Sequence, residues 1–352
     1  MGLASAASRS REEYEIRRAR AGKLLPFGVK FLDDALLGIL PNDLILIGAR
    51  SGAGKTQLCT RIALANVAKG SRVNFIALEA ESSEIEARLK FSVVMDAFYA
   101  DRSRPKIERR ITFQEFYTGL YGDLLRPYEE IAHDEFTRRY GGLFVFYKAS
   151  KFGVSDLIEQ VVAQSDDKQL IIIDHAHYFD FEDDNENRAL KQLARTVRTL
   201  ALEENKPIIL VAHLRKRDRG NTDIAPDLDE FHGSSDLAKI ATRVITLAPG
   251  GMDPSGCFET FFRIPKNRFD GGATRFMAQL KFDPRTNSYG DQYRLGWADQ
   301  SRKDAFTELD RALWPSWATG QGALGSVGRP ADSRQPRVPE SRSWEEVIKS
   351  SP

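Results

Sequence analysis

The chain has 352 residues, enough for one large domain or two smaller ones. Its 51 Lys and Arg residues balance 50 Asp and Glu residues, so net charge neither favours nor excludes a nucleic-acid partner, and any basic footprint must be local. The only cysteines, Cys59 and Cys257, lack metal-ligand spacing, and no apolar run approaches membrane-spanning length. We therefore expect a soluble cytoplasmic protein that does not contact a membrane.

Residues 1–25 form a charged N-terminal arm with few apolar positions, for which we expect a short solvated helix or an extended segment. Residues 26–296 carry the regular pattern of a single folded domain. Residues 297–352 are dominated by Gly, Pro, Ser and Arg, and this composition predicts a disordered tail.

The apolar run at residues 44–47 leads into the sequence ARSGAGKT, which precedes a predicted helix at residues 57–69. A strand, a glycine-rich turn and a helix N-terminus together form a phosphate cradle, because backbone N–H groups converge there and the helix dipole adds positive potential. We expect Lys55 to reach the terminal phosphates of ATP and the Thr56 hydroxyl to ligate Mg²⁺. The expected nucleotide contacts are Ala49, Arg50, Ser51, Gly52, Ala53, Gly54, Lys55, Thr56 and Gln57.

A second apolar strand is predicted at residues 73–78, and Glu79 follows it directly. At the end of the strand after the cradle, Glu79 is well placed to activate a water molecule, with Glu81 as the alternative. A predicted helix at residues 82–99 and a mostly helical stretch at residues 112–140 flank a basic break, so residues 96–142 form a helical and basic section within the domain.

Strands are next predicted at residues 143–149 and 169–173, with a helix at residues 154–164 between them. Asp174 ends the second of these strands, and we interpret it as the carboxylate that holds Mg²⁺ opposite Thr56. His175 and His177 follow it, but their spacing alone is a weak indication of a metal site.

A helix predicted at residues 188–205 leads to a strand at residues 207–212 that ends at His213. A polar side chain at this point can touch the γ-phosphate, although a lone histidine is more often structural. The remaining predicted elements are a helix at 236–241 and strands at 243–248, 257–265 and 274–283. Apolar strands alternating with helices predict an α/β fold with a mainly parallel sheet, helices on both faces and antiparallel edge strands.

Several of these segments together resemble the RecA-superfamily P-loop ATPases, and the form ARSGAGKT resembles the ATPase domain of DnaB-type hexameric helicases. The resemblance covers residues 27–283 and includes IALEA, IIIDH, VAHLRKR, GSSDLAKIATRVI and IPKNRFDGG. It implies a RecA-like core in which Glu79 is the catalytic glutamate, Asp174 the metal-side acid and His213 the sensor of the γ-phosphate. It also implies that Lys266 and Arg268 reach into the nucleotide site of a neighbouring subunit.

Two further segments would correspond to the loops that line the central channel of those helicases. The residues expected to contact single-stranded DNA are Arg215, Lys216, Arg217, Arg219, Gly233, Ser234 and Ser235. Phe231 and His232 could stack on bases or fill a small loop core. We expect no counterpart of the family's N-terminal collar domain in residues 1–25. The charged arm or the tail could instead bind a neighbouring copy or a protein partner.

The sequence thus predicts an ATP-driven motor of the helicase type that acts on single-stranded DNA as a ring, by resemblance a hexamer, with nucleotide sites between subunits. Two alternatives stay open. One is a RecA-like recombination or annealing-mediator ATPase that coats single strands as a filament. The other is an ATPase switch that controls a protein partner and does not move on DNA.

Overall fold

A computed structural model gives the fold for residues 7, 9–162, 170–181, 185–214, 224–231, 235–299 and 306–320. The strands are β1 (Leu44–Ala49), β2 (Val73–Ala77), β3 (Leu143–Tyr147), β4 (Leu170–Asp174), β5 (Ile208–His213), β6 (Arg243–Met252), β7 (Phe258–Asn267), β8 (Phe276–Asp283) and β9 (Ser288–Trp297). The α-helices are α1 (Ser10–Ala21), α2 (Lys30–Leu36), α3 (Lys55–Val67), α4 (Glu84–Ala100), α5 (Phe113–Tyr117), α6 (Gly122–Tyr140), α7 (Val154–Val162), α8 (Glu186–Glu203), α9 (Ser235–Ile240) and α10 (Ser316–Thr319). Short 3-10 helices are η1 (Ala176–Tyr178), η2 (Leu228–Glu230), η3 (Gly272–Arg275) and η5 (Arg311–Leu313).

The strands form one sheet in the order β3-β2-β4-β5-β1-β6-β7-β8-β9. The six strands from β3 to β6 run parallel, whereas β7, β8 and β9 continue the sheet in antiparallel pairs. The predicted fold class is therefore confirmed. The sequence reading missed β9 at the antiparallel edge.

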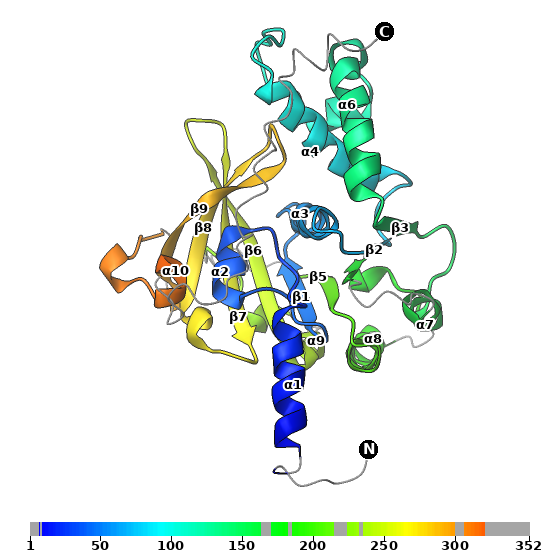
Figure 1. Ribbon diagram of the computed structural model, residues 1–352, viewed down its shortest axis with the longest axis vertical. Helices are drawn as coiled ribbons and strands as arrows, with labels where there is room; N and C mark the ends of the chain where they lie inside the picture. The colour runs from blue at the N-terminus through cyan, green and yellow to red at the C-terminus, as the bar shows by residue number, and fades with distance from the viewer. Residues whose placement is uncertain are drawn as a thin grey trace.

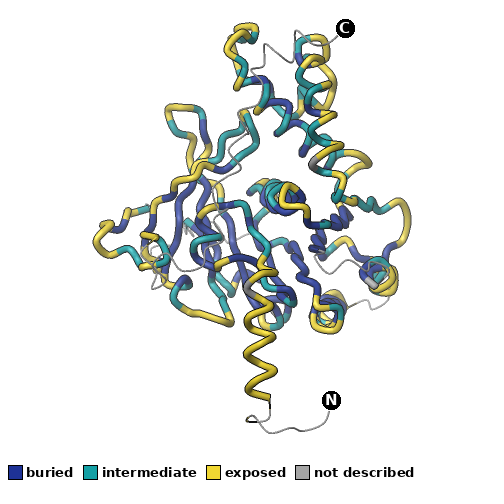
Figure 2. Tube along the Cα trace, in the orientation of Figure 1, coloured by how far each residue is buried: buried dark blue, intermediate teal, exposed yellow. Residues whose placement is uncertain are grey.

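Successive side chains of β1 point to opposite faces of the sheet. Since the side chains on both faces are apolar, helices cover both faces of the parallel part. Ile45 and Ile47 belong to a core cluster that includes α2 and α3, while Leu44 and Leu46 belong to a second cluster with α7 and α8. Figure 2 shows the resulting pattern, with buried strands inside and exposed outer helix faces. This packing fixes the strand ends and hence the side chains that follow them.

Helices α4, α5 and α6 build a separate apolar cluster around Phe91, Met95 and Phe98. They project away from the sheet at the end of the molecule opposite α1 (Figure 1). The predicted helical stretch at residues 112–140 is divided here by a turn at Gly119, whose positive φ favours glycine.

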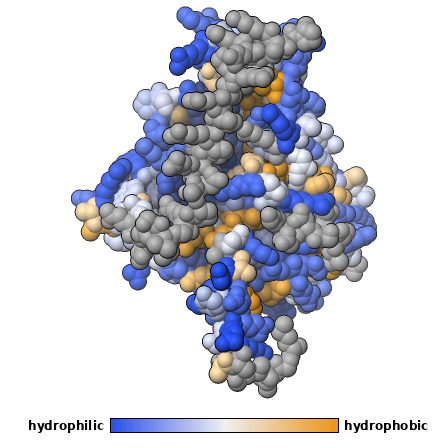
Figure 3. Space-filling view, in the orientation of Figure 1, coloured by the Kyte–Doolittle hydropathy of each residue, from blue (hydrophilic) through white to orange (hydrophobic). Residues whose placement is uncertain are grey.

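Helix α1 extends away from the domain, and all of its described side chains are exposed (Figure 1). Figure 3 shows mainly hydrophilic side chains along this helix. No helix among the described residues is both long enough and apolar enough to cross a membrane.

The expectation of a disordered tail from residue 297 onward is wrong for residues 306–320. Trp314 stacks on Tyr293 of β9 with ring centroids 5.6 Å apart, and Trp317 packs edge-on against Phe276. Buried Leu309 donates its backbone N–H to the Leu295 carbonyl at 2.6 Å. Burial of these apolar groups offsets the entropy of ordering a segment whose flanking composition had suggested disorder.

Candidate nucleotide-binding site

A glycine turn joins the end of β1 to the start of α3. Gly52 and Gly54 have φ values of 76° and 91°, which a residue with a Cβ adopts only with strain. Gly54 is the N-cap of α3, so the first N–H groups of the helix face the turn. This geometry matches the phosphate cradle expected from the sequence, with Ser51 and Gly52 exposed at its rim and Ala53 buried beneath it.

The Lys55 ammonium lies folded over the turn. It donates to the carbonyl oxygens of Ala49 and Arg50, each at 3.2 Å, and to Nδ1 of His213 at 3.1 Å. Burial lowers the pKa of Lys55, while the charges of Asp174 and Glu79 oppose that shift. A phosphate that entered the cradle would replace these neutral acceptors with charged ones.

Thr56 and Asp174 meet although 118 residues separate them. The Thr56 hydroxyl donates to Asp174 Oδ2 at 2.7 Å, and the second carboxylate oxygen of Asp174 is buried without a hydrogen-bond partner among the described residues. Burial raises the pKa of Asp174 to about 6. One hydroxyl and one incompletely satisfied carboxylate are the oxygen donors that suit Mg²⁺.

Glu79 follows β2 at the same edge of the sheet and is exposed. The charge of Glu79 raises the pKa of both Lys55 and Asp174, whereas the charge of Glu81 contributes to neither pKa shift. Burial and the nearby Glu79 carboxylate raise the pKa of Tyr178, and the Tyr178 carbonyl accepts from Lys148 Nζ at 2.7 Å. The sequence reading overlooked Tyr178, which has no motif of its own and reaches Glu79 only because β2 and β4 are neighbours.

His213 ends β5, which lies between β1 and β4 in the sheet. Its ring centroid lies 3.8 Å from that of His175, the residue after β4. Burial lowers the pKa of His213 to about 4, and the Lys55 charge adds to this shift. Neutral His213 can therefore accept a hydrogen bond from the Lys55 ammonium at physiological pH.

Gln57 and Arg50 face neighbouring loops in this structure. The Gln57 amide donates to the Asn287 carbonyl at 3.1 Å, in the turn between β8 and β9. Arg50 pairs with Glu230 at 3.3 Å. Both residues therefore connect the cradle to segments far away in the sequence.

Phe231 is fully buried in the core cluster beneath β1 and does not present its ring to solvent. A Cβ on Gly48 would overlap this ring, so the glycine is needed for the close approach. Of the two roles left open by the sequence, Phe231 fills the core. Gly48 within an apolar strand was the sequence feature that could have indicated such a close approach by another side chain.

Lys266 and Arg268 lie at the other end of the sheet. Lys266 pairs with Val244 at the start of β6, and the Arg268 N–H donates to the Thr242 carbonyl. The Lys266 ammonium donates to the carbonyls of Ala238 and Lys239 at the end of α9, while Arg268 is exposed. Strand β6 runs parallel to β1. The basic turn therefore lies at the amino edge of the sheet, where the parallel strands begin, and the cradle lies at the carboxyl edge, where they end.

The predicted DNA contacts Arg215, Lys216, Arg217, Arg219, Gly233 and Ser234 lie outside the described residues, as does His232. Ser235 begins α9, and nothing is described of its side chain. The flanking residues Glu230 and Phe231 are described, and both contact the start of the cradle.

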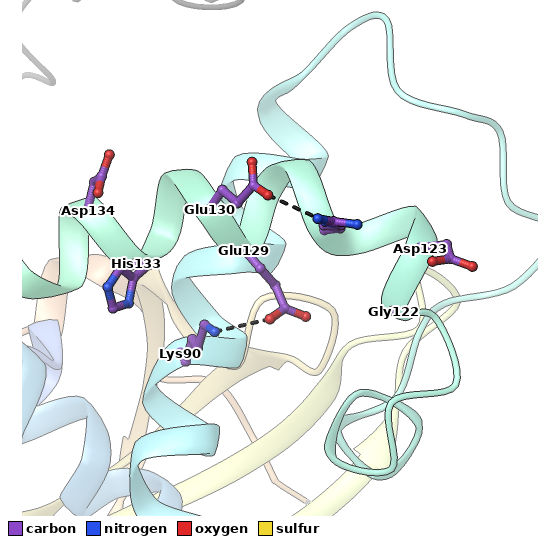
Figure 4. Close-up of a pocket in the computed structure, with 8 residues that line it drawn as sticks. Lys90, Gly122, Asp123, Glu129, Glu130, His133 and Asp134 are labelled. Atoms are coloured by element: carbon purple, nitrogen blue, oxygen red, sulfur yellow. Dashed lines mark hydrogen bonds and ion pairs between the residues drawn. The ribbon is translucent and has the colours of Figure 1, made fainter. Parts of the chain in front are cut away.

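A separate hollow lies between α4 and α6 (Figure 4). Lys90 pairs with Glu129 across it at 3.0 Å, and Arg126 pairs with Glu130 along α6 at 3.5 Å. Its lining contains no glycine turn joining a strand to a helix. The cradle is therefore the candidate site for a nucleotide.

The sequence of this chain is similar to those of known proteins over a region that includes the cradle. The family model described as DnaB-like helicase C terminal domain matches residues 25–115. The Replicative DNA helicase DnaB of Mycoplasma genitalium is 24% identical over 312 residues, covering 83% of this chain and 62% of that protein. A Probable plasmid replicative DNA helicase of Chlamydia trachomatis is 23% identical over 274 residues, covering 75% and 54%. The chain thus spans a little more than half the length of these relatives, and the resemblance to DnaB-like helicases is confirmed.

Solved structures confirm the fold. One solved ATPase domain aligns with a TM-score of 0.68 at 19% identity, over 83% of this chain and 100% of that chain. A DnaB-like replicative helicase studied with primase aligns with a TM-score of 0.65 at 17% identity, over 82% and 67%. The sheet described above therefore has the fold of these two solved structures.

Proposed function

We propose that this chain is an ATP-driven motor of the DnaB-like helicase type, which hydrolyses ATP between neighbouring copies and moves on single-stranded DNA. The observation that carries the proposal is the placement of the phosphate cradle and the basic turn at Arg268 on opposite edges of one sheet. The five residue steps of β1 separate these edges by about 16 Å at about 3.3 Å per residue. The sequence similarity to replicative DNA helicases supports the proposal that this motor is of the helicase type.

Within one copy, Lys55 and the N–H groups of the glycine turn bind the ATP phosphates. Thr56 and Asp174 are the residues that would hold Mg²⁺, which would neutralise charge on the β- and γ-phosphates. Glu79 accepts a hydrogen bond from the attacking water and orients it, and the nearby Tyr178 hydroxyl positions the Glu79 carboxylate. His213 moves from Lys55 to the γ-phosphate when the lysine turns toward the nucleotide.

Cations stabilise the charge that develops during phosphoryl transfer, and the basic turn lies too far from the cradle of its own copy to serve there. In a head-to-tail assembly, the amino edge of one sheet faces the carboxyl edge of the next, and closure of such an interface gives a ring. Exposed Arg268 then stabilises the transition state in the neighbouring site. Lys266 assists it after leaving the carbonyls at the end of α9. We propose a hexameric ring, with exposed α1 as a contact for a neighbouring copy or a protein partner.

Residues 215–219 and 233–235 would bind the DNA backbone without reading its sequence. Their described neighbours support a link to ATP. Glu230 pairs with Arg50 in the cradle, and Lys266 holds the end of α9, the helix that starts at Ser235. A change at the phosphates therefore has a short mechanical route to the DNA-binding loops.

Mixing two inactive variants tests the shared site. Lys55→Ala and Arg268→Ala should each lose single-strand-stimulated ATPase activity, whereas Glu79→Gln should still bind ATP. When the first two are assembled together at random, about a quarter of the interfaces combine an intact cradle with an intact Arg268, and activity should return in proportion. Absence of recovery in verified mixed assemblies would show that Arg268 does not act across the interface.

Two further measurements separate the motor from its alternatives. Electron microscopy with a non-hydrolysable ATP analogue and single-stranded DNA should show closed rings, whereas an open helical filament would indicate the recombination class. ATPase turnover that ignores single-stranded DNA, together with no retention on it at low salt, would indicate a switch acting on a protein.

A further inference from the structure

Three side chains with metal-ligating atoms converge where β2, β4 and β5 end. Glu79 follows β2, His175 follows β4 and His213 ends β5. One potential ligand atom from each lies within 4.8 Å of those from the other two. No pair among them is close in the sequence, so the strand order alone brings them together.

His175 supplies an independent indication that something binds there. The residue is 0% exposed, yet its Nε2 has no hydrogen-bond partner in the described part of the chain. Its other ring nitrogen accepts the His177 N–H at 3.4 Å, a long contact that constrains the ring only weakly. Buried polar atoms are nearly always satisfied, so an unpartnered ring nitrogen beside another imidazole and a carboxylate calls for a ligand.

We propose that His175, His213 and Glu79 form a site for a transition-metal dication of the zinc type. Two imidazoles and one carboxylate are a donor set typical of Zn²⁺ with one open position, whereas Mg²⁺ prefers oxygen donors. Zn–N bonds of about 2.0–2.1 Å require tetrahedral ligand atoms about 3.3 Å apart. The groups must therefore close by at most about 1.5 Å. Exposed Glu79 can supply part of this closure by side-chain rotation.

The Lys55 ammonium is the cationic neighbour of this site, since it contacts His213 Nδ1 at 3.1 Å. Its charge opposes metal binding until the lysine turns toward a phosphate, so metal affinity should rise when the cradle is filled. The bound metal would take Glu79 and His213 away from the groups proposed to serve ATP hydrolysis. It would therefore act as an inhibitor distinct from the Mg²⁺ held by Thr56 and Asp174.

Metal binding can be measured without any ATPase assay, so this proposal and the proposed function can fail separately. The probe is Co²⁺ alone, added to the untagged full-length chain, with detection of the visible absorption of four-coordinate Co²⁺. We expect one Co²⁺ per chain, displaced by Zn²⁺ but not by excess Mg²⁺. No such absorption, or Mg²⁺ displacing it equally well, would refute the site.

Variants locate the ion. His175→Ala should weaken Co²⁺ binding at least about tenfold, and Glu79→Gln should weaken it without risk to the core, because Glu79 is exposed. His133→Ala is the matched control, since His133 lies exposed on α6. Retention of full affinity in both Glu79→Gln and a folded His175→Ala, judged by circular dichroism, would overturn the assignment.

Discussion

The Lys55 ammonium and His213 Nδ1 are 3.1 Å apart, so the lysine expected to bind phosphate is held by a neutral imidazole from the adjacent strand. This contact joins the cradle to the end of β5, the strand that leads into the predicted DNA-binding loop. Arrival of a nucleotide must break it, because one ammonium cannot hold its present acceptors and a phosphate with the same geometry.

His213→Ala should lower kcat for ATP hydrolysis by roughly tenfold to a hundredfold with a smaller effect on ATP affinity, because it removes a group placed to follow the γ-phosphate. His213→Gln is the conservative control and should retain more activity, since its amide can both accept and donate. Steady-state kinetics and nucleotide titrations measure the two effects. Equal losses in both variants would argue that the imidazole has another role.

Asp174 gives a pH dependence of stability in the nucleotide-free chain. Burial raises its pKa to about 6 in the folded state from the ordinary 3.8, so the folded chain binds this proton more tightly. The stabilising contribution is present below about pH 4 and is lost as pH rises through about 6. Asp174→Asn should therefore exceed the wild type in unfolding free energy by about 1–3 kcal/mol near pH 8.

Urea unfolding without Mg²⁺ or nucleotide, repeated across pH, measures this difference. It should shrink toward zero as pH falls to about 4, because both forms are then uncharged at this position. Asp299→Asn, at an exposed carboxylate, is the control and should change little. An asparagine variant less stable than the wild type at every pH would show that burial does not disfavour the carboxylate.

Tyr178 should act by positioning Glu79. Tyr178→Phe keeps the ring and removes the hydroxyl that lies near the Glu79 carboxylate. We expect kcat to fall severalfold while KM for ATP stays nearly constant, the pattern of an interaction that matters mainly in the transition state. Tyr117→Phe, at an exposed tyrosine of α5, is the control. A raised KM with normal kcat would place Tyr178 in nucleotide binding instead.

The ends of the buried strands could be predicted because Val, Ile and Leu runs stop at polar residues, and Asp174 and His213 are such stops. The grouping of His175 with His213 could not be predicted, because it depends on β5 lying beside β4. Strand β9 was missed because Gly290, Asp291 and Gln292 interrupt its pattern, although Tyr293 and Leu295 face the core. The low strand propensity of these residues is outweighed there by antiparallel pairing with β8.

Gly48 and Phe231 form a second link between the cradle and the predicted DNA-binding segment. Gly48→Ala should destabilise the chain by about 1–3 kcal/mol, because the added methyl group overlaps a fully buried ring. Phe231→Leu opens space beside Gly48. Gly48→Ala should therefore cost less unfolding free energy in the Phe231→Leu background than in the wild type. Chemical unfolding of the four forms gives the coupling energy. Additive effects would mean that the ring does not pack on Gly48.

Trp314 and Trp317 anchor residues 306–320 to the antiparallel part of the sheet. Trp317 contacts Phe31 of α2 and Phe276 of β8, and Trp314 stacks on Tyr293 of β9. Trp317→Ala should therefore lower the unfolding free energy by about 2–4 kcal/mol, somewhat below the range for fully buried Trp because the side chain is only partly buried. Leu313→Ala is the matched control on the same segment, since Leu313 is 59% exposed and should cost less than about 0.5 kcal/mol. Because the Trp314 and Trp317 rings pack on α2, β8 and β9, ATP affinity of the folded Trp317→Ala chain should remain unchanged. If both variants unfolded like the wild type, residues 306–320 would not be part of the folded domain, and the antiparallel edge would have to be stable without them.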